Sequence, residues 1–205
     1  MNKKINGDEY TNFDELRLKE TLYEIWCVEG SSGVAVIAPH GGKIEPGTSE
    51  IARGIAGAEH TFYSFVALRE TENKRYLHLT STNFDEPIAV SIVQQSERVI
   101  AIHGCKGESA FLELGGLDKD LKELIDNKLS KHFKIREPKD SRPGERKNNI
   151  CNRGKNHGVQ IEISKGLRDS MFAANTIPGR LRPPKENFIK FVSAVREAIE
   201  EISKS

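Results

Sequence analysis

Three apolar runs constrain the fold of this chain more than any other feature of its sequence. Residues 34–39 are continuously apolar, residues 99–102 repeat that pattern, and residues 159–163 alternate apolar and polar side chains. Continuous apolar, β-branched runs are typical of strands that are covered on both faces of a sheet. The runs therefore predict an α/β fold with a mixed central β-sheet flanked by helices.

Length and composition favour one globular domain. A chain of 205 residues can bury one substantial core, so we expect a single catalytic domain over residues 1–205. Hydrophobic residues make up 37% of the chain, and the net charge is +1. These values exclude a disordered acidic chain and a protein that is strongly basic throughout.

Targeting signals and cysteines point to a protein made in the cytosol. No stretch approaches the roughly 20 apolar residues that span a membrane. The first residues, MNKKINGDEYTNF, lack the apolar region of a signal peptide. Cys27, Cys105 and Cys151 are odd in number and widely spaced, which favours free thiols. We expect a monomer without a membrane partner.

The remaining pattern predicts a series of strands and helices. A capping box at residues 11–14 indicates a short helix. Strands are expected at residues 23–28, 61–68, 75–80 and 98–103. Helices are expected at residues 48–57, 87–96, 117–129 and 188–202. Residues 137–158 are predicted to form a long polar loop.

Each apolar run carries or leads to a residue of the kind that works at a catalytic zinc ion. His40 follows the first run, with Glu45 five positions later; His103 follows the second, and Glu162 lies in the third. Two histidines and a carboxylate can hold Zn²⁺ while its fourth position stays open to water. A second glutamate can act as general base. Ligands gather beyond the carboxyl ends of strands in open α/β sheets, so these residues can converge.

Each candidate also has a simpler interpretation. His40 alone could be a turn histidine, Glu45 a solvated loop acid, and Glu162 a solvent-facing acid in a strand. The alternative histidine ligands are His60, His78, His132 and His157. Of these, His157 is favoured because it precedes the strand that carries Glu162.

Three stretches carry a family resemblance. VAVIAPHGGKIEPGTSEIA, RVIAIHG and VQIEISKGLR resemble the phage poly-γ-glutamate hydrolase family, and the similarity runs from about residue 10 to residue 202. The resemblance implies a small zinc hydrolase with a zinc carboxypeptidase-like fold. It implies that His40, Glu45 and His103 bind Zn²⁺, with Glu162 as general base. It also implies an anionic polymer substrate, poly-γ-glutamate, reached by host lysis and degraded as an extracellular capsule.

Two departures from the wider carboxypeptidase pattern limit this transfer. Four residues separate His40 from Glu45, where carboxypeptidases have two, so the turn must differ in shape. The pair Asn152 and Arg153 follows His103, whereas the carboxypeptidase Asn-Arg pair precedes the last histidine ligand. The role of that pair in binding a terminal carboxylate is therefore not transferred.

Basic residues are candidates for binding the polymer. Residues 131–155 contain nine Lys or Arg against three Asp or Glu, and such a basic segment can face an anionic substrate. Every γ-linked glutamate keeps an α-carboxylate, and the candidates to bind it are Lys106, Arg153, Lys155 and Arg168. Arg168 is also a catalytic candidate, because it could stabilise the oxyanion; structural pairing is the alternative.

The predicted reaction is amide hydrolysis by a zinc-activated water with Glu162 as base. One alternative keeps the metal and changes the substrate, to cell-wall peptides or N-acyl amino acids. Another is a nucleic-acid binding protein of phage replication that uses residues 131–155. Phe133 is the one aromatic residue in that segment, which argues against a stacking platform for single strands.

Overall fold

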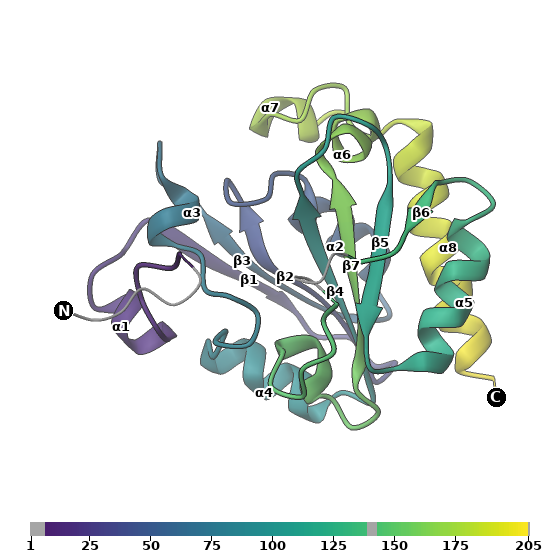
Figure 1. Cartoon of the computed structure of the whole chain (residues 1–205), viewed down its shortest axis with the longest axis horizontal. Coiled ribbons are helices and arrows are strands. Elements are labelled where there is room, and N and C mark those ends of the chain that lie inside the picture. Colours follow the sequence, from purple (N-terminus) through teal and green to yellow (C-terminus); the bar gives the residue numbers. More distant parts are fainter. Residues whose placement is uncertain (1–6, 139–142, 205) are drawn as a thin grey trace.

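The computed structural model describes residues 7–138 and 143–204, which form a seven-stranded sheet flanked by helices (Figure 1). The strands are β1 Tyr23–Val28, β2 Val34–Gly42, β3 Thr61–Ala67, β4 Arg98–Cys105, β5 Leu112–Gly116, β6 Ile135–Arg136 and β7 Gly158–Ser164. The helices are α1 Phe13–Arg17, α2 Thr48–Ala56, α3 Asn73–Tyr76, α4 Pro87–Gln95, α5 Lys119–Leu129, α6 Lys165–Met171, α7 Ile177–Arg180 and α8 Glu186–Ile202, with the 3₁₀ helix η1 at Ile150–Arg153.

The sheet is mixed, as the sequence predicts. Its strand order is β1-β3-β2-β4-β7-β5-β6. Strands β3, β2, β4 and β7 are mutually parallel, whereas β1 and β5 run antiparallel to their neighbours β3 and β7. The three apolar runs become β2, β4 and β7, which lie side by side at the centre. Their carboxyl ends therefore meet at one edge of the sheet, toward α6 and α7 in Figure 1.

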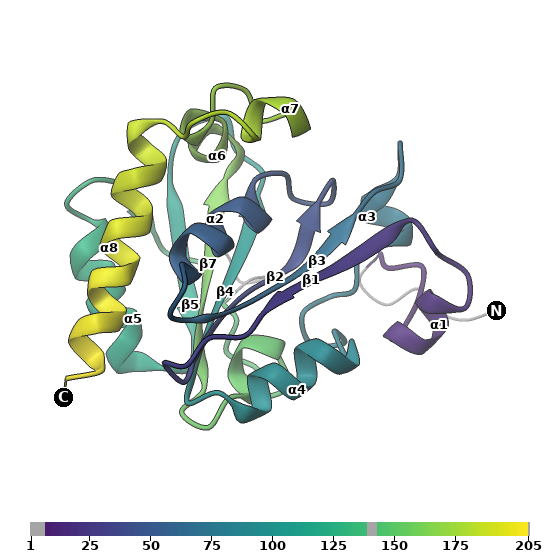
Figure 2. The same cartoon turned by 180° about the vertical axis from the view of Figure 1, so that it is seen from behind.

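Helices cover the two faces unequally. Helices α2, α5 and α8 pack on one face, which Figure 2 shows from their side. Alternate residues of β2, β4 and β7 join them in one apolar cluster. The other face carries α4, η1 and a second cluster that includes Ile37, Ala101 and Phe84. Both faces of the central strands are buried, which explains their continuous apolar runs.

Several regions differ from the sequence prediction: the expected loop 137–158 contains η1, and α6 was not expected. The strand expected at residues 75–80 is wrong: α3 ends at Tyr76, and Leu77 and Leu79 are buried from an irregular segment. Asp8 accepts hydrogen bonds from the His78 ring and from the Thr80 amide, so side-chain contacts take the place of a strand ladder.

Strand β5 was not predicted, because Glu113 and two glycines have low β propensity. Its antiparallel partner β7 supplies the ladder that the local sequence does not indicate. Lys139, Asp140 and Arg142 of the predicted basic loop, and the ends of the predicted 1–205 domain, lie outside the described residues. Within the described residues, no helix is long and apolar enough to cross a membrane.

Candidate metal centre and active site

His40 reaches the site because β2 contains an irregularity. The register between β2 and β3 shifts between Ala38 and Gly41. In a regular strand His40 would share the face of Ala38, which belongs to the apolar cluster under α2 and α8. The shift changes that alternation, since bulges re-aim side chains. The His40 ring instead lies against Phe84 and His103 on the other face.

Glu45 is held by backbone contacts in the turn that follows β2. Gly42 has φ of 66°, and an added Cβ there would lie 2.4 Å from the carbonyl oxygen of Ala67, so glycine is required at this position. The Glu45 amide donates to the carbonyl of His40 at 3.0 Å. The Gly104 amide donates to Oε2 of Glu45 at 2.8 Å. The turn therefore directs this buried carboxylate back toward β4.

Two imidazole nitrogens and the two oxygens of one carboxylate converge where β2 and β4 end. Nδ1 of His40 lies 3.1 Å from Nδ1 of His103 and 3.3 Å from Oε1 of Glu45. Nδ1 of His103 lies 3.6 Å from Oε2 of Glu45. All three residues are buried. His40, Glu45 and His103 thus form one cluster, as predicted from their positions at or after the carboxyl ends of strands.

The ring orientation of His40 defines which nitrogen faces the cluster. Nε2 of His40 lies 2.8 Å from the carbonyl oxygen of Leu79, which can only accept, so Nε2 carries a proton. In the neutral ring Nδ1 is then a lone-pair donor. Nε2 of His103 lies 3.5 Å from the Ser81 hydroxyl, which can support the same arrangement. Lone pairs and a carboxylate at this spacing require a proton or a cation between them.

The pKa shifts agree with that requirement. Burial alone would lower the pKa of His40, but the adjacent Glu45 carboxylate outweighs it, and the pKa is raised above its usual value. Burial alone would raise the pKa of Glu45, but His40 and His103 hold it well below its usual range. A buried carboxylate that stays ionised beside two imidazoles is an environment that attracts a positive charge.

His78, one of the alternative ligands expected from the sequence, extends the cluster together with Asp8, which was not expected there. The rings of His40 and His78 lie against each other, with centroids 4.1 Å apart and planes tilted by 33°. One donor atom each from His40, Glu45 and His78 lies within 4.8 Å of the others. Nδ1 of His78 is bonded at 2.6 Å to Oδ1 of Asp8, which is buried. A carboxylate behind an imidazole is the usual support of a metal-binding histidine.

Glu162 lies next to His103 across the sheet. In the ladders, Glu162 of β7 pairs with His103 of β4 on one side and with Glu113 of β5 on the other. Paired residues share a face, so the three side chains form a row. Nε2 of Gln160 donates to Oε1 of Glu162 at 3.1 Å. The predicted general base is therefore buried beside the cluster, not exposed to solvent.

The Arg168 guanidinium binds backbone carbonyls around the site and does not occupy the space between the candidate ligands. Its guanidinium donates to the carbonyls of Ile163, Pro46 and Cys105, at 3.1, 2.6 and 3.3 Å. It covers Gly104, where an added Cβ would lie 2.6 Å from Cζ of Arg168. These carbonyls belong to the segments that carry Glu162, Glu45 and His103. The geometry favours the structural alternative over oxyanion binding.

The other three basic candidates lie in different places. Lys106 is exposed directly after β4, at the carboxyl end of the strands. The Arg153 guanidinium donates to the carbonyl of Thr82 at 3.3 Å, and the neighbouring hydroxyl of Ser81 contacts His103. Lys155 is different: its ammonium pairs with Glu97 at 2.6 Å, before β4 begins. The structure does not bring Lys155 to the cluster.

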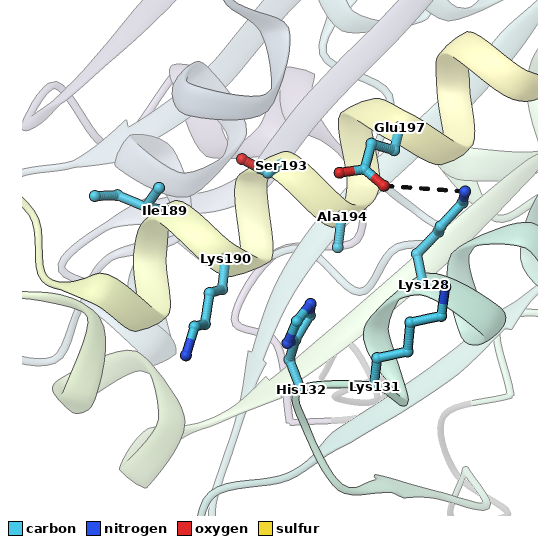
Figure 3. A pocket seen from close by; sticks show the side chains of 8 residues that line it. All are labelled: Lys128, Lys131, His132, Ile189, Lys190, Ser193, Ala194 and Glu197. Carbon is cyan, nitrogen blue, oxygen red and sulfur yellow. Dashed lines mark ion pairs between the residues drawn. The ribbon is translucent and has the colours of Figure 1, made fainter.

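Of the four alternative histidines, His78 joins the cluster. His60 contacts the Ser32 hydroxyl near the start of β3, and His157 contacts the carbonyl of Asn152. His132 lines a hollow of about 190 Å³ between α5 and α8 (Figure 3). Lys128 and Glu197 form an ion pair across that hollow, which lies on the helices of the apolar face.

Four residues near Glu162 or His78 were not predicted from the sequence. The alternation of residues 159–163 already places Gln160 on the same face as Glu162, and that signal could have identified Gln160. Asn149, Glu113 and Asp8 had no such signal, because each reaches the site through contacts distant in sequence.

Comparisons with known proteins agree with this geometry. The model of a family described as poly-gamma-glutamate hydrolase matches residues 10–194. Two similar proteins of Bacillus subtilis (strain 168) are UPF0714 protein YndL, 36% identical over 92% of this chain and 76% of that protein, and the SPbeta prophage-derived UPF0714 protein YoqZ, 34% identical over 98% and 74%.

Solved structures extend the likeness to the fold. A bacteriophage poly-gamma-glutamate hydrolase superposes with a TM-score of 0.89 at 32% identity, over 95% of this chain and 98% of that chain. Zinc-free YndL superposes with a TM-score of 0.88 at 35% identity, with the same coverage. N-formylglutamate amidohydrolase from Ralstonia eutropha JMP134 shares the fold, with a TM-score of 0.54 at 10% identity over 88% of this chain and 97% of that one. The matches confirm the predicted zinc carboxypeptidase-like α/β fold.

Proposed function

The chain belongs to the poly-γ-glutamate hydrolase family, and from that premise we propose that it is a zinc-dependent enzyme that cleaves the γ-glutamyl amide bonds of poly-γ-glutamate. The observation that carries the proposal is the convergence of His40, Glu45 and His103, with Glu162 beside them in the sheet. A phage hydrolase of the same fold supports a role as a capsule depolymerase.

The donor set fits zinc. In a tetrahedral site with ligands about 2.0–2.1 Å from the ion, neighbouring donor atoms lie about 3.3 Å apart. Nδ1 of His40 lies 3.1 Å from Nδ1 of His103 and 3.3 Å from Oε1 of Glu45, and Oε2 of the same carboxylate lies 3.6 Å from Nδ1 of His103. Imidazole nitrogen and carboxylate oxygen are both zinc ligands, and the existence of a zinc-free form of YndL as a distinct structure is consistent with a zinc-binding family.

His40, Glu45 and His103 would hold the ion, with His78 as the alternative nitrogen donor. Nδ1 of His78 faces Asp8, which leaves Nε2 as its lone-pair atom. His103 is preferred because its Nδ1 lies 3.1 Å from that of His40 and shares the Glu45 carboxylate. Removing each histidine separately distinguishes the two sets.

The chemistry at Glu162 is proton transfer. Bound zinc would supply Lewis acidity that polarises the amide carbonyl and acidifies water. The Glu162 carboxylate would take a proton from the attacking water as its oxygen joins the carbonyl carbon. It would then give that proton to the leaving nitrogen as the C–N bond breaks. One carboxylate can perform both transfers when it lies about 3 Å from the water.

Substrate binding would use cations at the carboxyl ends of the strands. Each γ-linked residue keeps an α-carboxylate, so a polymer crossing the site presents a regular row of negative charges. Lys106 and Arg153 are the candidates whose positions suit this role. Arg168 would act on the frame of the site through the three carbonyls that it binds.

The test measures zinc content and the loss of viscosity of purified poly-γ-glutamate in parallel. Wild type is expected to bind about one zinc per chain and to depolymerise the polymer. His103→Ala is expected to lose the metal, and Glu162→Gln to keep the metal while its rate falls by about 10²- to 10⁴-fold. His78→Ala is expected to retain zinc.

Each other result identifies the part of the proposal that fails. Zinc without depolymerisation would retain the hydrolase and move the substrate to cell-wall peptides or N-acyl amino acids. Zinc lost in His78→Ala and kept in His103→Ala would replace one ligand by the other. A folded wild type that binds no zinc would overturn the zinc mechanism.

A further inference from the structure

Hydrogen bonds connect three buried polar side chains, Asn149, Gln160 and Glu162, and we call this connected set the relay. Nδ2 of Asn149 donates to Oε1 of Gln160 at 3.0 Å, and Nε2 of Gln160 donates to Oε1 of Glu162 at 3.1 Å. All three residues are buried. We propose that Gln160, held by Asn149, is the positioning residue of the general base; this inference rests on the proposed function, in which Glu162 is that base.

A backbone amide sets the direction of these hydrogen bonds. The amide N–H of Cys151 donates to Oδ1 of Asn149 at 3.1 Å. A backbone N–H can only donate, so the Asn149 oxygen must face it, and Nδ2 must face Gln160. Gln160 then presents its oxygen to Asn149 and its nitrogen to Glu162. The relay can therefore end only in a donor directed at the carboxylate.

The secondary structure holds both ends of the relay. Asn149 caps η1, which packs against β4 and β7. Gln160 and Glu162 are two positions apart in β7, so they share the face that also carries His103. A carboxylate on a central strand with a directed donor has little rotational freedom. General-base catalysis depends on such placement, and a displacement of about 1 Å can cost about 10²-fold in rate.

A second buried acid lies beside Glu162. Glu113 of β5 pairs with Glu162 in the ladder, and both are buried. Gln160 donates to Glu162, which is also the ladder partner of His103. The hydrogen bond therefore fixes the position of the carboxylate that lies next to His103.

Two substitutions separate positioning from packing. Gln160→Met keeps the volume and removes the donor to Glu162. Asn149→Asp keeps the shape and replaces Nδ2 by oxygen, so Gln160 must turn its nitrogen toward position 149 and its oxygen toward Glu162. The matched control is Gln95→Met, the same change at an exposed glutamine of α4.

The kinetic expectation is a loss in kcat alone. Each relay variant is expected to lower kcat by roughly 10- to 100-fold, with KM and zinc content within about twofold of wild type. In the Glu162→Gln background, Gln160→Met is expected to leave the residual rate unchanged, because the group that it positions is gone. Wild-type kcat in a folded Gln160→Met or Asn149→Asp protein, or an equal loss in the Glu162→Gln background, overturns the proposal.

Crystal structures of the variants provide a readout that does not depend on the substrate. The carboxylate of Glu162 is expected to move from its wild-type position in both relay variants and to stay in Gln95→Met. An unmoved carboxylate overturns the proposal. If wild type fails to cleave the polymer, the proposed function fails, and this structural result still decides whether Gln160 positions Glu162.

Discussion

The two faces of β7 are both buried, but different interactions stabilise them: apolar packing on one face and hydrogen bonds on the other. Val159, Ile161 and Ile163 join the apolar cluster under α5 and α8. Gln160 and Glu162 alternate with them, and hydrogen bonds connect these two to each other and to Asn149. The hydrophobic effect that stabilises the apolar face is non-directional. The polar face depends on donors and acceptors at defined positions, and so it can hold a reactive group in place.

Strand β2 shows the same contrast along its length. Val36 and Ala38 belong to the apolar cluster under α2 and α8, and the irregularity after Ala38 moves His40 to the opposite face, where His103 and Glu162 lie. The strand thus contributes to the core with one half and to the site with its end. Changes that move a charge onto the apolar face, or remove one from the polar face, test how far this division holds.

The largest loss of stability is expected when a charged side chain replaces an apolar one on the apolar face of β7. Ile161→Glu would bury a carboxylate among aliphatic side chains. An uncompensated buried charge costs about 3–5 kcal/mol or more, a large part of the roughly 5–15 kcal/mol that stabilises a typical domain. Urea unfolding followed by circular dichroism should show little or no folded protein at 37 °C.

Ile161→Val is the matched control for this position. It removes one methylene and should cost about 0.5–1.5 kcal/mol, with zinc content and polymer cleavage unchanged. If Ile161→Glu were folded with wild-type stability, the division between the two faces of β7 would not hold.

Arg168 is the exception on the apolar side, and its removal is expected to have the next largest effect. It covers Gly104, which shares the face of Ile102, and it donates to three carbonyls, those of Ile163, Cys105 and the half-buried Pro46. Arg168→Met would leave these acceptors without their donor, at a cost of about 3 kcal/mol or more. Zinc affinity should fall as well, because two of the carbonyls adjoin the segments of Glu45 and His103.

Arg180→Met provides the comparison for Arg168→Met. Arg180 pairs with Glu50 of α2 at 2.6 Å and donates to Asn175, whereas Arg168 donates to the three carbonyls themselves. Its loss should lower stability without changing zinc affinity. Equal zinc affinities in Arg168→Met and wild type would show that Arg168 does not hold the site in shape.

The apolar side of the molecule could be predicted because its signal is local. Residues 34–39, 99–102 and 159–163 identified the central strands, and the stripe that includes Phe191, Val195 and Ile199 identified α8. Strand β5 could not be predicted, since Leu112–Gly116 becomes a strand through its partner β7. Residues 75–80 alternate like a strand, but contacts with Asp8 hold them in another form.

The candidate site was only partly predictable for the same reason. His40, Glu45, His103 and Glu162 follow strands that the sequence reveals, and the structure brings them together. Asp8 comes from a segment without regular structure, so nothing local indicated its position, and His78 was one of four alternative histidines, of which the sequence favoured His157. Lys155 lies in the basic segment and was therefore a candidate to bind the polymer, but its contact with Glu97 places it near the amino end of β4.

A smaller effect is expected from Asp8 on the polar side. Burial alone would raise the pKa of Asp8, but the His78 ring and the Thr80 amide lower it below its usual value of 3.8. A carboxylate with a depressed pKa stabilises the fold above that value, and the contribution is lost as the pH falls through the folded pKa. Asp8→Asn should therefore cost about 1.5–3 kcal/mol at pH 7.

The pH dependence separates charge from shape at Asp8. In urea titrations with a chelator present, the difference between wild type and Asp8→Asn should shrink below about pH 3.8. Asp14→Asn is the control, because its partner Arg17 is exposed and such pairs contribute about 0–1 kcal/mol. A difference at Asp8 that stays constant with pH would assign its effect to packing.

The smallest effect is expected at the amino end of β4, where Lys155 and Glu97 form an ion pair with both side chains more than half exposed. Exposed pairs contribute about 0–1 kcal/mol, so Lys155→Ala should barely change stability. It should also leave the KM for poly-γ-glutamate within about twofold of wild type, because the strand ends that carry the cluster lie at the other edge of the sheet.

Arg153→Ala, which removes a cation beside Thr82 and Ser81, should raise KM without changing zinc content. If Lys155→Ala raised KM as much as Arg153→Ala, the polymer would have to contact both ends of the sheet, and the separation of a catalytic edge from a structural one would be lost.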